Sequence, residues 1–485
     1  GAETIGSLAG GGATGGTVTI GGATLTTGGA ADTTFAGLIQ GTGRLVKAGS
    51  GTFTLSSTTA NTYAGGTTVS AGTLSIDNDN QLGAVPGVAT AGHILLAGGT
   101  LATSANVTLA ATRGVALGTG GGTFQAATGT TLSYGGIVAN DGATVGNLTK
   151  TGAGTLTLSG ANTYTGNTTI SAGVLRAASS SALGTSAGTN SVASGAALEL
   201  IGGVTVADAI TLNGTGVGSA GALRNISGNN TVSGTITLAT ASRINSDAGT
   251  LSLDVAAGNA VTATNLGLTV GGTGDTTVAD PIATGTGSLT KDGAGTLTLS
   301  GANTYTGNTT ISAGVLRAAS SSALGTSAGT NSVASGAALE LIGGVTVADA
   351  ITLNGTGVGS AGALRNISGN NTVSGTITLA TASRINSDAG TLSLDVAAGN
   401  AVTATNLGLT VGGTGDTTVA DPIATGTGSL TKDGAGTLTL SGASTYTGAT
   451  TINAGTLTTS GNTAIPDASA VTLANAATAV FNVQG

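Results

Sequence analysis

An internal duplication is the longest feature of this sequence, and it limits the fold more than any other feature does. The runs 152–302 and 293–443 are identical, so that Gly293 repeats Gly152 and Gly434 repeats Gly293. Each run opens with the string GAGTLTLSGANTYTG, which returns at Gly434 with Ser444 in place of asparagine, and a looser version occupies 49–65. A chain that repeats a long unit head to tail must adopt an architecture that lengthens along one axis without disturbing its core.

Short phrases with period-two alternation fill the repeated unit. Examples are GTLTL from Gly154, GTITL from Gly234 and GTLSLDV from Gly249, each set off by Gly, Asn, Ser or Asp. In GTLTL, Leu156 and Leu158 point to one side and the threonines to the other, as in a β-strand. No window shows the 3.6-residue period of a helix. Strands this short, numerous and regular predict an all-β fold, a β-solenoid that forms an elongated rod.

The repeat length also predicts how the solenoid is divided. A coil of about 20 residues is typical of solenoids, so one 141-residue unit should hold roughly seven whole coils. We therefore expect one continuous β-solenoid over residues 1–485. Its identical units are 152–292 and 293–433, and residues 1–151 and 434–485 are diverged or partial units.

The composition agrees with a narrow core. Glycine contributes 89 residues, aromatics only 2% and charged residues only 7%. Disordered chains combine low hydrophobicity with high net charge, whereas the mean hydropathy here is +0.36. Leu, Val, Ile and Ala fit a thin column of stacked coils, Thr and Ser suit its outer faces, and Gly and Asn supply the corners.

Charge and cysteine content exclude several classes of function. The net charge is −8 and no run of Lys or Arg occurs, so the electrostatic footprint of a nucleic-acid binder is missing. No stretch approaches the roughly 20 apolar residues of a membrane-spanning helix, so no membrane insertion of this segment is expected. The absence of cysteine rules out disulfides, thiolate metal sites and a cysteine nucleophile.

The stretch GAGTLTLSGANTYTGNTTISAGVL, from Gly152, resembles the passenger-associated repeat of bacterial autotransporter proteins, whose consensus runs close to GxGTLTLSGxNTYxGxTTxxxGTL. Glycines, inward leucines, asparagines and tyrosines carry the resemblance. These structural repeat positions are Gly154, Leu156, Leu158, Asn162, Tyr164, Gly166, Gly173, Gly295, Asn303, Tyr305, Gly436 and Tyr446.

The resemblance implies a right-handed parallel β-helix at the outer surface of a Gram-negative bacterium. Full-length members of the family also carry a signal sequence and a C-terminal membrane barrel, and this sequence shows neither. The chain starts at Gly1 without Met, and its tail from Ala470 looks like another coil. We therefore expect an internal fragment of a longer, extracellular protein.

The sequence offers few groups for catalysis. A nucleophilic triad needs a base, and the single histidine, His93, is expected to be an edge or turn residue. β-Helix enzymes often cut polysaccharides with paired carboxylates, and Asp254 and Asp275 lie about one coil apart. Turn aspartates are common for backbone reasons, however, so we expect no catalytic residues and no enzyme.

Metal and cofactor motifs are incomplete. GGTGDTTVA at 271–279 has Asp275 one place too early for a calcium-binding nonapeptide. The pair Asp77 and Asp79 lacks the glycine and the terminal glutamate of an EF-hand loop. Neither glycine-rich loop, at 118–123 or 271–275, precedes a helix, so neither can cradle a phosphate. We expect no metal and no cofactor.

The tyrosines are the one aromatic series that recurs with the repeat. Tyr164, Tyr305 and Tyr446 hold equivalent positions, and Tyr63 matches them in the looser copy. Exposed aromatic rings can stack on sugars, so these tyrosines are candidate glycan contacts. The alternative, which the turn-forming asparagine nearby favours, is a ring that packs over the corner.

Together these observations predict a structural surface protein, either a β-helical stalk, an adhesin shaft or a filament-forming segment. Partners would be a second copy, associating end to end into fibres through unpaired strand edges, or surface glycans and other cells. The alternatives are a surface enzyme that degrades polysaccharides and a glycan-binding passenger.

Overall fold

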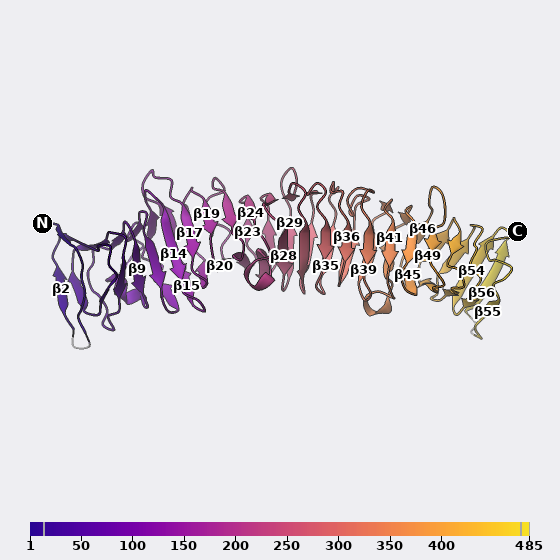
Figure 1. Ribbon diagram of the computed structural model, residues 1–485, viewed down its shortest axis with the longest axis horizontal. Helices are drawn as coiled ribbons and strands as arrows, with labels where there is room; N and C mark the ends of the chain where they lie inside the picture. The colour runs from indigo at the N-terminus through magenta and orange to yellow at the C-terminus, as the bar shows by residue number, and fades with distance from the viewer. Residues whose placement is uncertain (13–14, 476–477, 485) are drawn as a thin grey trace. The chain divides into compact units, whose positions relative to one another are not determined.

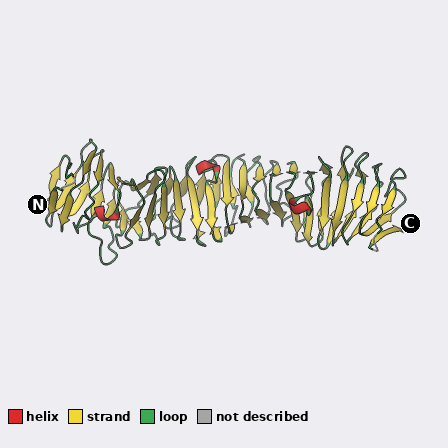
Figure 2. Ribbon diagram, turned by 90° about the horizontal axis from the view of Figure 1, so that it is seen from below, coloured by secondary structure: helices red, strands yellow, loops and turns green. Residues whose placement is uncertain are grey.

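The computed structural model describes residues 1–12, 15–475 and 478–484. It divides into two compact units, Gly1–Asn245 and Ser246–Gly485. Parallel strands stack coil upon coil in each unit (Figure 1). Among the described residues, three short 3₁₀ helices interrupt the strands (Figure 2): η1 (Asp79–Leu82), η2 (Val217–Ser219) and η3 (Val358–Ser360). The predicted all-β solenoid is confirmed.

In the first unit, the strands form three main sheets. Each sheet takes one strand from successive coils, and two further pairs, β2 (Thr17–Ile20) with β5 (Leu38–Gly41) and β23 (Thr205–Val206) with β26 (Asn230–Val232), add to them. The first sheet contains β1 (Glu3–Ile5), β3 (Thr24–Thr27), β6 (Arg44–Lys47), β8 (Thr67–Val69), β10 (Ile94–Leu96), β13 (Val115–Leu117) and β16 (Val138–Asn140). The second contains β4 (Thr33–Phe35), β7 (Thr52–Leu55), β9 (Thr73–Ile76), β11 (Thr100–Thr103), β14 (Gly122–Ala126), β17 (Leu148–Thr151), β19 (Thr168–Ile170), β21 (Asn190–Val192), β24 (Ile210–Leu212) and β27 (Ile236–Leu238). The third contains β12 (Val107–Leu109), β15 (Thr131–Tyr134), β18 (Thr155–Leu158), β20 (Val174–Ala177), β22 (Ala197–Ile201) and β25 (Leu223–Ser227).

The second unit has the same plan, and β28 (Ser242–Ser246) lies at the boundary between the units in the sequence. One sheet contains β31 (Leu268–Gly272), β34 (Leu289–Lys291), β36 (Thr309–Ile311), β38 (Asn331–Val333), β41 (Ile351–Leu353), β44 (Ile377–Leu379), β47 (Val402–Thr403) and β50 (Ile423–Ala424). The next contains β29 (Thr250–Leu253), β32 (Asp275–Val278), β35 (Thr296–Leu299), β37 (Val315–Ala318), β39 (Ala338–Ile342), β42 (Leu364–Ser368), β45 (Ser383–Ser387), β48 (Leu409–Gly413), β51 (Leu430–Lys432), β53 (Thr450–Ile452) and β55 (Val471–Leu473). The last contains β40 (Thr346–Val347), β43 (Asn371–Val373), β46 (Thr391–Leu394), β49 (Asp416–Val419), β52 (Thr437–Leu440), β54 (Gly455–Ser460) and β56 (Ala479–Gln484), and β30 (Val261–Thr262) pairs separately with β33 (Ile282–Ala283).

The order of strands along the chain shows that each coil has three faces. Strands β41, β42 and β43 lie in three different sheets, and β44 returns to the sheet of β41. The expected tail coil is present, because β55 pairs with β53 and β56 pairs with β54.

The core is built from columns of apolar side chains, and each column takes one side chain from each coil. In the second unit one such column is Leu297, Leu316, Leu339, Leu364, Ile385 and Val411, each at most 1% exposed. The spacing between successive members in the sequence is uneven, because corners and protruding loops differ in length from coil to coil. Each member buries its apolar surface against the residues of the coils on either side.

The expectation of about seven whole coils in each 141-residue unit is wrong. From β34, six strand pairings lead through β36, β38, β41, β44 and β47 to β50. The equivalent of β34 in the next copy is β51, which follows β50 and pairs with β48 on the neighbouring face. One unit therefore contains six coils and one further face, because its coils are on average longer than the typical length assumed from the sequence.

Candidate functional site

The repeated string folds as a strand, a corner and the beginning of the next strand. In the copy that begins at Gly293, β35 buries Leu297 and Leu299 and turns Thr296 and Thr298 outward. The chain then turns through 300–308 and enters β36. An added Cβ at Gly295 would lie 2.0 Å from the carbonyl oxygen of Gly274 in the previous coil, so only glycine fits at this position.

The repeat asparagine joins three consecutive coils. Asn303 Oδ1 accepts a hydrogen bond from the amide of Ile282 in the preceding coil (2.8 Å), and Nδ2 donates to the carbonyl oxygen of Ala323 in the following coil (2.7 Å). Asn162 makes the same two bonds, to Val138 and Ala182. A buried side chain with both polar groups paired stabilises the corner without an unsatisfied donor or acceptor.

Ser444 replaces this asparagine in the third copy and can form only one of its two hydrogen bonds. Its Oγ accepts from the amide of Ile423 at 3.3 Å, a longer bond than Asn303 makes to Ile282. Serine has no amide group to donate to the following coil in the way that Asn303 does. The third copy therefore has a weaker corner than the second.

The repeat tyrosines lie in the core. Tyr164, Tyr305 and Tyr446 are 0% exposed, and each hydroxyl bonds to the threonine four residues later at 2.7 to 2.8 Å. Burial raises the pKa of Tyr305 well above its usual range. No sugar can stack on rings that solvent does not reach, so the expectation of glycan contacts at Tyr164, Tyr305 and Tyr446 is corrected. The corner-packing alternative describes them instead.

A buried lysine stands at the start of each repeat, and no sequence pattern above singled it out. The side chain of Lys291 is 2% exposed, and its Nζ donates to the carbonyl oxygens of Asp292 (2.7 Å), Gly293 (2.8 Å) and Ala313 (3.2 Å). The same three-carbonyl cage surrounds the ammonium groups of Lys47, Lys150 and Lys432. Because two carbonyls come from one coil and the third from the next, the lysine fastens neighbouring corners. The recurrence of a lysine shortly before the repeat glycines was the available signal.

Glycine shapes this cage. Gly314 has a φ of +65°, and an added Cβ there would lie 2.4 Å from the carbonyl oxygen of Gly293, a member of the cage. Its equivalent in the first copy, Gly173, has a φ of +66° and the same contact with Gly152. Only glycine adopts this backbone without strain and leaves the carbonyl free to face the lysine.

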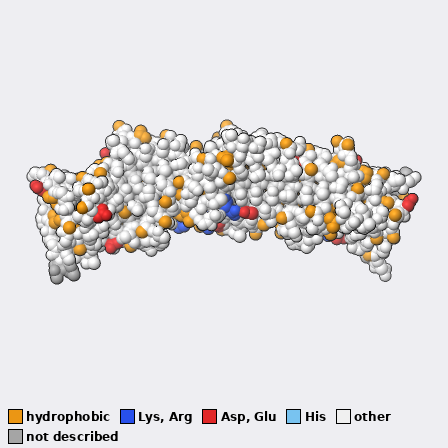
Figure 3. All heavy atoms as spheres, in the orientation of Figure 1, with side chains coloured by type: hydrophobic (Ala, Val, Ile, Leu, Met, Phe, Trp, Pro, Cys, Tyr) orange, Lys and Arg blue, Asp and Glu red, His pale blue; other side chains and the backbone are white. Residues whose placement is uncertain are grey.

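Alternating charges run along one outer face of the second unit. Arg317 pairs with Glu340 (2.7 Å), Glu340 also pairs with Arg365 (3.2 Å), and Arg365 pairs with Asp388 (2.6 Å). The first unit repeats the beginning of this ladder, since Glu199 lies between Arg176 and Arg224. On the face shown in Figure 3, the side chains of Lys, Arg, Asp and Glu are sparse. Opposite charges one coil apart attract, so the ladder supports the stacking.

A second buried cation holds η1 in the first unit. Arg113 is 0% exposed, and its guanidinium donates to Asp79 Oδ1 (2.8 Å) and to the carbonyl oxygens of Leu82 (2.9 Å) and Gly83 (2.7 Å). Arg113 thus stabilises the short helix that contains Asp79. Among the described residues, no group of three or more His, Cys, Asp or Glu side chains is arranged to hold a metal ion.

His93 lies beside this arginine. It is 4% exposed, and within the part of the chain that the structure describes neither ring nitrogen has a hydrogen-bond partner. Burial lowers the pKa of His93 to about 4, with further lowering by Arg113 and Arg44 and a smaller opposite effect of Asp79. The imidazole is neutral at physiological pH, and its nitrogens form no hydrogen bond to a nucleophile among the described residues, so it is a buried histidine.

The two aspartates considered as an acid–base pair do not meet. Asp275 lies opposite Thr250 in the β29–β32 register, four residues from Asp254, which corresponds to about 13 Å along a strand. Its carboxylate instead accepts a hydrogen bond from the amide of Thr296 (2.8 Å). Both aspartates are exposed and lie outside any enclosed site.

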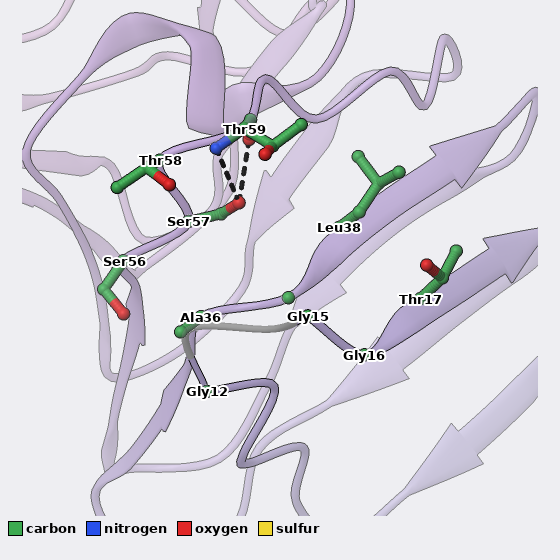
Figure 4. Close-up of a pocket in the computed structure, with 11 residues that line it drawn as sticks. Gly12, Gly15, Gly16, Thr17, Ala36, Leu38, Ser56, Ser57, Thr58 and Thr59 are labelled. Carbon is green, nitrogen blue, oxygen red and sulfur yellow. Dashed lines mark hydrogen bonds between the residues drawn. The ribbon is translucent and has the colours of Figure 1, made fainter.

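Two of the surface hollows in the first unit are lined by uncharged residues. One of about 350 Å³ is lined by glycines and hydroxyl side chains near Thr17 and Ser57 (Figure 4), where Ser57 Oγ donates to the carbonyl oxygen of Thr59. The other, of about 370 Å³, is lined mainly by Ala and Gly between Ala89 and Asn140. Neither lining contains a titratable side chain, so neither hollow can perform acid–base chemistry. No helix among the described residues is long and apolar enough to cross a membrane.

Comparison with known proteins identifies the repeat. The family model described as "Passenger-associated-transport-repeat" matches residues 45–76, 148–177, 289–318 and 430–458. Each match opens on the strand that carries the buried lysine and includes the asparagine–tyrosine corner or, in the last copy, its serine variant.

One curated relative extends this result. Over 193 residues the chain is 38% identical to the adhesin BmaC autotransporter of Brucella suis biovar 1 (strain 1330). The match covers 39% of this chain and 6% of the adhesin's own length, so the chain corresponds to a small part of that relative. No solved structure matches the chain.

Proposed function

We propose that this chain is a stretch of an extracellular, cell-surface autotransporter passenger with β-helical repeats, and that it acts as a non-enzymatic shaft segment of an adhesin. Its task is to add length, so that binding sites elsewhere in the protein stand away from the cell. The side chains that the repeat preserves act inside the solenoid, as corner ties and core.

The observation that carries this proposal is the uninterrupted core column from Leu297 to Val411. Identical units continue such a column through the same contacts, so copying a unit extends the solenoid without new interactions. At about 4.8 Å per coil, six coils and one face add about 30 Å.

A seamless deletion tests the proposal. Removing residues 293–433 from the full-length surface protein joins Asp292 to Gly434, and this junction has the same sequence as the natural Asp433–Gly434 junction. We expect normal surface levels, a passenger shorter by about 30 Å in electron micrographs, and unchanged binding to ligand in solution. Inserting one extra copy is the matched control and should lengthen the passenger equally. Loss of ligand binding at normal surface levels would show that the unit carries the binding site.

A further inference from the structure

Equivalent strands of successive repeats lie on different faces. In the second unit, β34 opens one repeat within the sheet that runs from β31 to β50, whereas its equivalent β51 lies in the sheet of β35, β48 and β53. In the first unit, β6 lies in the sheet of β8 and β10, and its equivalent β17 lies in the sheet of β14 and β19. In both compact units, the strand that opens one repeat and the strand that opens the next repeat therefore lie on different faces.

Outward side chains follow the same displacement. Thr298 belongs to a column that continues one coil at a time through Arg317, Glu340 and Arg365. Its equivalent in the next copy is Thr439, which lies in β52 and pairs with Thr418 and Thr458 in the last sheet. Six coils beyond β35, the face of Thr298 instead carries β51 and its outward Thr431, which come from a different part of the repeat.

From this geometry we infer that each successive 141-residue unit presents its copied outer surface on the next of the three faces. A partner that recognises this surface then meets it in three directions around the axis, and the same face recurs only after three units. The inference rests on the proposed shaft function and deepens it, because it describes the directions in which a shaft of such units presents its outer surface to partners.

The displacement matters for multivalent binding. Two sites in line on one face, about 30 Å apart, can be engaged together by one flat partner such as another cell surface, and the second contact gains from a high effective concentration. Sites turned by a third of a revolution cannot face the same flat partner, so that gain is lost. A shaft built this way offers one site in every direction and no continuous adhesive strip along one side.

Introduced cysteines test the register directly, because the chain has none of its own. Thr410 and Thr431 are paired neighbours on adjacent coils, so T410C/T431C should form a disulfide readily on mild oxidation. The matched control is A424C/T431C, which joins the faces of β50 and β51 and should stay reduced. Preferential crosslinking of the control pair would place β51 on the face of β50 and overturn the inference.

Labels on the intact chain test the direction. Biotin attached at T298C and T439C, equivalent positions in successive copies, should place two streptavidin molecules on different sides of the solenoid in electron micrographs. In the control T298C/T431C both labels should project from one side. Labels at Thr298 and Thr439 projecting from the same side would overturn the inference, and because no ligand is used, the outcome is independent of the shaft proposal.

Discussion

Arg384 and Asp433 form a bidentate ion pair, at 2.7 and 2.8 Å, although they belong to coils that are not adjacent. The strand between them contributes Gly412, where an added Cβ would lie 2.0 Å from Asp433 Oδ1 and 2.3 Å from Arg384 Nη2. A glycine in the middle coil therefore allows two charged side chains to meet above it.

Gly412→Ala should break this pair at small cost. The groups in its way are the ends of flexible side chains that can turn into solvent, and partly exposed ion pairs contribute only about 0.2–1 kcal/mol. Urea unfolding of G412A, D433N and the double variant measures the effect. We expect the two losses of unfolding free energy not to add in the double variant, since both substitutions remove the same ion pair. Fully additive losses would mean that Gly412 has another role.

Ser444→Asn should strengthen the weakest corner. The new amide can accept from Ile423 and donate to the carbonyl of Ala464, which corresponds to the Ala323 partner of Asn303. A buried hydrogen bond of this kind contributes about 1 kcal/mol. Hydrogen exchange of the Ile423 amide should slow several-fold, and Asn303→Ser should speed exchange of the Ile282 amide in return. Unchanged exchange in both variants contradicts the assigned role of the asparagine.

Lys291→Met should destabilise the second unit by about 1–3 kcal/mol, because three buried carbonyl oxygens lose their shared donor. Methionine keeps most of the side-chain volume, so packing is nearly preserved. Arg317→Met is the matched control: its side chain is 35% exposed and belongs to the outer ladder, so it should cost less than about 1 kcal/mol. Chemical denaturation measures the loss of stability in both variants. Equal losses would contradict a special role of the carbonyl cage.

Tyr305→Phe should cost about 1 kcal/mol, the hydrogen bond to Thr309. Tyr305→Ala should cost about 3–5 kcal/mol, since it empties a large buried site. Thermal unfolding separates the two, and cell binding by full-length protein carrying Y305F should equal that of the wild type. A loss of binding in stably folded Y305F would restore the tyrosine as a ligand contact.

Acid should weaken the first unit through His93. Its pKa is about 4 in the folded chain and about 6.5 when unfolded, so as pH falls through this window the unfolded chain binds the proton first. Stability contributed by the neutral imidazole is complete above pH 6.5, falls toward pH 4 and changes little below. Burial sets the direction of this pKa shift, the charges of Arg113 and Arg44 add to it, and Asp79 opposes it. His93→Leu should flatten the stability profile between pH 6.5 and 4, and an unaltered slope would contradict it.

The local architecture followed from the sequence alone. Alternation in GTLTL showed which leucines point inward, and the glycine and asparagine positions marked the corners, because strands and turns depend on neighbouring residues. The repeat itself predicted the solenoid and the match to the passenger-associated repeat. The asparagine's place at a corner was also predictable, although its two partners were not.

Everything that depends on coil length emerged only in the folded chain. Because the coils differ in length, one repeat of the chain completes six turns and one further face. An estimate of about 20 residues per coil cannot predict this extra face. Because the coil lengths were unknown, the sequence could not predict the partners of Lys291 and Arg384. For the same reason it could not show that Asp254 and Asp275 lie apart. Which residues meet across coils depends on the sum of every corner between them, so only the tertiary structure shows that Tyr305 is core and that each repeat faces a new direction.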